Sequence, residues 1–86
     1  MNTYTAVYSN DTIIEMKLPK LTRRFYKFLI DELIFTSHLE KGDSSMKLYC
    51  NGVTVAILDL YIWDDGTGSI FLYGSRIRDI NREHYI

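Results

Sequence analysis

An Asn-Gly pair at residues 51–52, between two segments rich in β-forming side chains, restricts the fold of this chain more than any other feature. A two-residue hairpin turn of type I′ needs a positive φ at both central residues, and Asn-Gly meets that need well. The pair therefore predicts an antiparallel hairpin between residues 45–50 and 53–63. A second connection at residues 64–68 then predicts a third strand over residues 69–77.

This three-stranded meander would carry apolar side chains on both of its faces. If Trp63 faces Ser69, the even-numbered residues of the second hairpin form an aliphatic face and the odd-numbered ones an aromatic face. The first hairpin, however, places Met46 and Leu48 on the aromatic side. Three explanations are open: a bulge near residues 56–57, a cover supplied by the N-terminal hairpin or a second subunit, or a binding surface. The expected binding face comprises Asp59 opposite Tyr73, Tyr61 opposite Phe71, and Trp63.

The N-terminal part of the chain predicts another hairpin. Residues 3–8 and 12–18 alternate in polarity around a short polar turn. A two-residue loop would place Val7 opposite Ile14 on an apolar face and leave Tyr4 and Tyr8 on a wetter one.

A long helix is expected next, over residues 20–40. Pro19 ends the preceding strand, because it has no N–H to donate, and its fixed φ suits the start of a helix. Apolar residues from Leu21 to Ile34 repeat at helical spacing, and Gly42 is the expected C-terminal cap. Residues 78–86 are polar and predict a short helix or a frayed end.

These elements predict an α+β fold of order ββαβββ. The expected architecture is a two-layer sandwich, in which an antiparallel sheet of four to five strands packs on one long helix. The length fits a single domain over residues 1–86. The only cysteine, Cys50, excludes an internal disulfide, and the chain starts without the basic and apolar regions of a signal peptide. No apolar run reaches the roughly 18 residues of a membrane span, so we expect a cytoplasmic protein.

A basic cluster at residues 17–27 contains lysines and arginines but no acidic residue. Cations in the first turns of a helix oppose its dipole, and an anionic partner would offset that cost. Nucleic acid is one such partner, although a net charge of −1 weakens this reading and a solvated helix face is the ordinary explanation. The expected anion-binding residues are Lys17, Lys20, Arg23, Arg24, Lys27, Arg76 and Arg78.

Patterns for catalysis or metal binding are weak. The loop at residues 64–68 contains carboxylates and glycines, but its spacing matches neither a calcium loop nor a phosphate loop. His38, His84 and Cys50 have reactive side chains, yet nothing in the sequence orients one toward another. We therefore expect no enzyme activity, no metal and no cofactor.

In composition the chain resembles the accessory proteins of bacteriophages and other mobile elements, being short, rich in tyrosine and isoleucine and nearly free of proline. The resemblance covers no particular residues and implies a stoichiometric inhibitor of a host or defence protein. The first hypothesis is therefore a non-enzymatic protein-binding module that uses the aromatic face or an exposed strand edge. Nucleic-acid binding through the basic cluster is one alternative, and a homodimer joined through the aromatic face is another.

Overall fold

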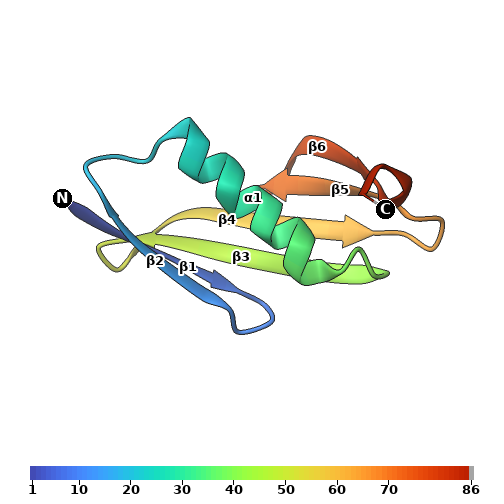
Figure 1. Cartoon of the computed structure of the whole chain (residues 1–86), viewed down its shortest axis with the longest axis horizontal. Coiled ribbons are helices and arrows are strands. Elements are labelled where there is room, and N and C mark those ends of the chain that lie inside the picture. Colours follow the sequence, from blue (N-terminus) through green and yellow to red (C-terminus); the bar gives the residue numbers. More distant parts are fainter. Residues whose placement is uncertain (86) are drawn as a thin grey trace.

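The computed structural model describes residues 1–85 and shows one helix packed on one face of a six-stranded antiparallel sheet (Figure 1). The sheet order is β2-β1-β3-β4-β5-β6, and α1 crosses the sheet obliquely. The predicted α+β fold is confirmed, with six strands in place of four to five. The elements are β1 (Asn2–Tyr8), β2 (Ile13–Leu18), α1 (Arg23–Ser37), β3 (Gly42–Cys50), β4 (Val53–Ile62), β5 (Thr67–Leu72), β6 (Ser75–Asn81) and a short 3₁₀ helix (Arg82–Tyr85).

The core lies between α1 and the sheet face that α1 covers. Along β4, every second residue from Ala56 to Ile62 is buried, as expected for a strand with one covered face. The Tyr8 hydroxyl donates a hydrogen bond of 2.9 Å to the Leu29 carbonyl oxygen, which ties β1 to the helix. The largest fully buried side chains are Leu29, Leu33, Met46, Leu48, Leu58, Leu60, Ile62 and Ile70.

A β-bulge resolves the conflict between the two faces of the meander. Cys50 pairs with Val53 as the Asn-Gly turn predicts, but the register shifts between Leu48 and Tyr49. Val55 is the extra residue, so Leu48 pairs with Ala56 rather than with Val55. Of the three explanations left open by the sequence, the bulge is therefore present, one residue before the expected place, and it brings the apolar residues of β3 and β4 onto the covered face.

The N-terminal hairpin has a longer loop than predicted, and its register differs by one residue. The Tyr8 N–H donates to the Thr12 carbonyl oxygen at 2.9 Å, and Asp11 has a φ of 73°. Such a three-residue loop, closed by a residue in the left-handed region, is a common alternative to the two-residue turn. A shift of one residue reverses the faces of β1. The prediction that Tyr4 and Tyr8 lie on the wetter face was therefore wrong, since both are buried in the core.

The predicted strand over residues 69–77 is two strands joined by a tight turn. Tyr73 and Gly74 have φ values of 48° and 82°, the positive values that a two-residue hairpin of the type I′ class needs. The chain then continues as β6 and buries Ile80, instead of forming only a helix or a frayed end. Ile86, the last residue of that prediction, lies outside the described residues.

The helix is shorter at both ends than predicted. The Thr22 hydroxyl accepts a hydrogen bond of 3.1 Å from the Phe25 N–H, so Thr22 is the N-cap and Pro19 lies in the connection before it. At the other end His38, with a φ of 55°, takes the left-handed conformation that was expected of Gly42. Gly42 begins β3 instead.

Candidate functional site

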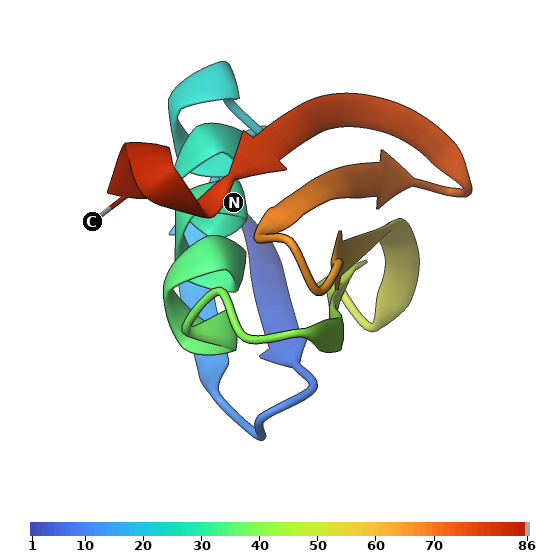
Figure 2. The ribbon, with the colours of Figure 1, turned by 90° about the vertical axis from the view of Figure 1, so that its right-hand side faces the viewer.

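The sheet face opposite α1 is uncovered, and we call it the open face. Figure 2 shows α1 on one side of the strongly curved sheet, with no helix or strand of the described chain against the other side. The N-terminal hairpin extends the sheet beside β3 and so does not cover this face. Within residues 1–85, the open face is therefore accessible to a partner.

Two aromatic side chains lie on the open face at the end of β4. The rings of Tyr61 and Trp63 have centroids 4.5 Å apart and planes inclined by 52°. Both are exposed, Tyr61 by 37% and Trp63 by 56% of their surface. Phe71 is half-buried on the neighbouring strand, directly opposite Asp59. Four of the five predicted binding residues thus share this face.

The register between β4 and β5 differs from the prediction by two residues. Tyr61 pairs with Ser69 and Asp59 with Phe71, so the predicted pairs of Tyr61 with Phe71 and Asp59 with Tyr73 were wrong. A shift of two residues moves each side chain along the partner strand without changing its face. Asp59, Tyr61 and Phe71 therefore lie on the predicted face, although their predicted partners were incorrect.

Tyr73 lies apart from the other four aromatic-face residues. It occupies the β5–β6 turn rather than a strand. Burial raises the pKa of Tyr26 on α1, and the nearby Tyr73 raises it further, so Tyr73 lies within electrostatic range of the helix. Tyr73 therefore does not belong with Tyr61, Trp63 and Phe71 on the open face.

The loop after β4 holds Trp63 in place. The Trp63 N–H donates to the Thr67 carbonyl oxygen at 2.7 Å. Asp65 accepts hydrogen bonds from the Thr67 hydroxyl at 2.7 Å and the Thr67 N–H at 3.0 Å. These bonds, the hydroxyl first, lower the pKa of the Asp65 carboxyl. The loop is the hairpin connection that the sequence predicts, and it restricts the backbone beside the indole.

Open-face residues that the sequence reasoning did not include are Val7 and Ile57. Val7 pairs with Ile13 and Lys47 on this face, and Ile57 also pairs with Lys47. Ile57 shares the face of Asp59 through the two-residue period of β4, whereas Val7 changes face through the three-residue turn. The Ser-Asn-Asp composition of that turn was the only available signal for Val7.

The predicted anion-binding residues do not form one patch. Lys17 and Arg76 lie on β2 and β6, the two opposite edges of the sheet. Arg24 lines a groove against β2, whereas Arg23 and Lys27 line a different hollow of α1.

Two of these arginines also have acidic neighbours. The Arg78 guanidinium lies 3.7 Å from the Asp31 carboxylate of α1. Arg76 lies 3.6 Å from Asp79 on its own strand. Both pairs are exposed and each contributes little stability, but they reduce the positive charge that β6 offers to a phosphate.

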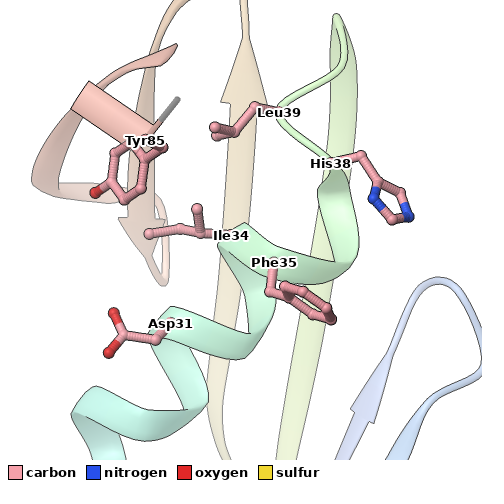
Figure 3. Close-up of a pocket in the computed structure, with 6 residues that line it drawn as sticks. All are labelled: Asp31, Ile34, Phe35, His38, Leu39 and Tyr85. Atoms are coloured by element: carbon pink, nitrogen blue, oxygen red, sulfur yellow. The ribbon is translucent and has the colours of Figure 1, made fainter. Parts of the chain in front are cut away.

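A hollow of about 400 Å³ lies between the second half of α1 and the 3₁₀ helix (Figure 3). Figure 3 shows Ile34, Leu39 and Tyr85 around one side of it, while Asp31 and His38 lie at opposite ends. The carboxylate and the imidazole therefore do not form an acid–base pair in this hollow.

A second hollow, of about 420 Å³, brings together Ser69, Asp79 and His84. The Ser69 hydroxyl donates directly to the Asp79 carboxylate at 3.1 Å. A serine nucleophile is activated by a histidine that accepts its proton, and here the carboxylate occupies that position. This arrangement orients Ser69 without activating it.

No group of histidine, cysteine and acidic side chains within residues 1–85 has the arrangement of a metal site. No helix in that part of the chain is long and apolar enough to cross a bilayer. Comparisons with protein-family models, with curated proteins and with solved structures found no match.

Proposed function

We propose that this protein is a non-enzymatic module that binds another protein through its open face. The observation that carries the proposal is the contact of Tyr61 with Trp63, both exposed, on a sheet face that no described element covers. Tyrosine and tryptophan dominate the energetic centres of protein interfaces, because they bury a large rigid area and keep a polar group.

The position of the pair favours tight binding. Tyr61 lies on β4, which has hydrogen-bonded neighbours on both sides, and Trp63 follows it in a hydrogen-bonded loop. Rings that are already ordered lose little conformational entropy on binding. The pair is also bordered by polar groups, among them Asp59 and Ser69, and protein interfaces commonly combine an apolar centre with a polar rim.

The composition that resembles phage accessory proteins favours an inhibitor among protein-binding modules. Such a protein would form a stoichiometric complex and act by covering a functional surface of a host or defence protein. The charges of both signs around the open face would select the partner's orientation, while the aromatic rings would supply most of the affinity.

The test begins with capture of partners from a bacterial lysate treated with nuclease, followed by affinity measurements on the captured protein. We expect Trp63→Ala to weaken the complex by about 2 kcal/mol, roughly thirtyfold in Kd. Phe35→Ala is the matched control, since Phe35 is 70% exposed but lies on α1. Equal affinities for Trp63→Ala and Phe35→Ala would refute binding through the open face.

Two alternatives have distinct results in the same experiment. A homodimer joined through the open face would sediment as a dimer that Trp63→Ala dissociates. A nucleic-acid-binding protein would lose its captured material on nuclease treatment and would bind more weakly as salt rises. The dispersal of the basic residues disfavours this last reading.

A further inference from the structure

The edge of the sheet formed by β2 has a regular row of free backbone groups. The hydrogen bond from the Tyr8 N–H to the Thr12 carbonyl oxygen fixes the phase of the β1–β2 ladder. Hydrogen-bonded and non-hydrogen-bonded pairs alternate in an antiparallel ladder. Counting along the register from Tyr8 and Thr12, the backbone N–H and C=O groups of Ile13, Glu15 and Lys17 point away from β1 and toward the free edge.

The other edge of the sheet is less suited to pairing. The register of β5 with β6 shifts between Ile70 and Phe71, and such an irregularity interrupts the row of backbone groups. Arg76, Arg78 and Asp79 also place three charges along β6, and such charges are a common means of discouraging strand addition. Only two charged residues, Glu15 and Lys17, lie on β2. The six paired residues of β2 have no such shift.

An apolar groove lies beside the β2 edge, on the side of the sheet that α1 covers. It has a volume of about 370 Å³. Met16 and Phe28 form parts of its walls and are 41% and 43% exposed. A strand added to β2 would point every second side chain toward this groove. The lining residues are Met16, Leu18, Thr22, Arg24, Phe25 and Phe28.

The charges around the groove are unevenly distributed along its length. Arg24 lines it, and Lys20 lies at the same end, where β2 finishes and the chain passes toward α1. Glu32 lies farther along α1. Burial raises the pKa of Tyr8 and the nearby charge of Glu32 raises it further, so the negative charge is toward the opposite end. An acidic group beside Arg24 would also offset the cost of cations in the first turn of α1.

From these three features we infer that the β2 edge binds an extended segment of a partner protein by strand addition. The segment has apolar side chains at alternate positions, which fill the groove, and acidic side chains near Arg24. Backbone hydrogen bonds to Ile13, Glu15 and Lys17 would hold the segment, and the groove would select its sequence. This inference uses a surface separate from the open face and does not depend on the function proposed above.

The test is a selection from a library of short random peptides displayed on phage, with the whole chain as the target. We expect enriched peptides in which apolar residues alternate and acidic residues gather at one end. Synthetic copies of these peptides should shift the amide NMR signals of β2 and of the first turns of α1. Failure to enrich any peptide, or enrichment of peptides that shift only the open face, would overturn the inference.

A pair of substitutions at Glu15 isolates the role of the backbone. Glu15→Pro removes an N–H that points away from β1, so it leaves the β1–β2 ladder intact, and proline is tolerated on edge strands in this orientation. Glu15→Ala removes the same side chain and keeps the N–H. We expect Glu15→Pro to weaken peptide binding about tenfold or more and Glu15→Ala to stay within about twofold of the original protein. Equal binding by both variants would exclude strand addition.

Further variants separate the charge, the open face and self-association. Arg24→Glu should weaken binding of the acidic peptides about tenfold, whereas Trp63→Ala should leave it unchanged. If Arg24→Glu leaves binding unchanged, or if Trp63→Ala abolishes it, the assignment to this groove is wrong. A chain that is dimeric alone, and becomes monomeric with Glu15→Pro, would show that a second copy occupies the edge, and that result would also overturn the inference.

Discussion

Gly68 on β5, beside the open-face aromatic pair, has the least room for an added side chain among the glycines of this chain, and it allows a quantitative prediction. Gly68 pairs with Ile62 of β4. A Cβ added at Gly68 would overlap the carbonyl oxygen of Tyr61 and lie 2.8 Å from the Cδ1 of Ile62. Because the Tyr61 oxygen belongs to the backbone, β5 can accept a methyl group only by moving away from β4.

We expect Gly68→Ala to destabilise the protein by about 3 kcal/mol, the upper part of the usual range for overpacking. A chain of 86 residues has a total stability of roughly 4–13 kcal/mol, so this is a large fraction of it. Gly68 does not have a positive φ, so the loss is steric rather than conformational. With a urea m-value of about 1 kcal/mol per molar, the midpoint of unfolding should fall by about 3 M.

Gly74→Ala is the matched control for this prediction. Gly74 has a φ of 82° but no neighbouring atom within 4 Å of an added Cβ, so alanine there meets backbone strain alone. That strain is worth about 1–2 kcal/mol. If urea unfolding shows Gly74→Ala to be the less stable variant, or Gly68→Ala to match the original protein, the proposed close contact between β4 and β5 is wrong.

Three further substitutions test other parts of the account. Thr22→Ala removes the hydroxyl that accepts a hydrogen bond from the Phe25 N–H, and it should lower the free energy of unfolding in urea by about 1 kcal/mol. Mild heating should cause a matching loss of helical circular dichroism. An unchanged midpoint would exclude Thr22 as the N-cap. Leu58→Ala, in the fully buried centre of β4, should cost about 2–5 kcal/mol, and a loss below 1 kcal/mol would contradict its place in the core. Burial, with a smaller contribution from the charge of Glu32, raises the pKa of Tyr8, so the folded state holds this proton more tightly than the unfolded chain does. The contribution of Tyr8 to stability is therefore complete below the ordinary tyrosine pKa of 10.0 and decreases as the pH rises above that value. Tyr8→Phe should flatten this part of the stability–pH curve relative to the original protein.

The turn with a characteristic residue pair could be predicted from the sequence, and the turns without one could not. The pair at residues 51–52 has the residues that a type I′ turn favours, and the pairing of Cys50 with Val53 beside it was predicted correctly. Beyond the bulge at Val55 the register differs from the prediction by one residue. Tyr73 takes a positive φ that its residue type rarely adopts, so Gly74 was the only local signal of the turn between β5 and β6. The turn at residues 9–11 is compatible with loops of two or three residues, and only the burial of Tyr4 and Tyr8 in the core selects the longer one.

The candidate site shows the same division between local and tertiary information. Asp59, Tyr61 and Trp63 were placed on one face because the two-residue period of a strand is independent of its exact register. The basic residues at 17–27 are close in sequence, but the chain passes from the edge of the sheet to two different sides of α1 over that interval. Their dispersal depends on the packing of α1 against the sheet, which no local pattern encodes.

The environment of Trp63 in the complex tests the central claim most directly, because this chain has one tryptophan. Replacing it with 5-fluorotryptophan gives a single ¹⁹F NMR signal that reports on solvent contact at the open face. On saturation with the captured protein partner, we predict that this signal moves and loses its dependence on the H₂O/D₂O ratio of the solvent. A signal that keeps its position and its solvent dependence at saturation would contradict binding through the open face.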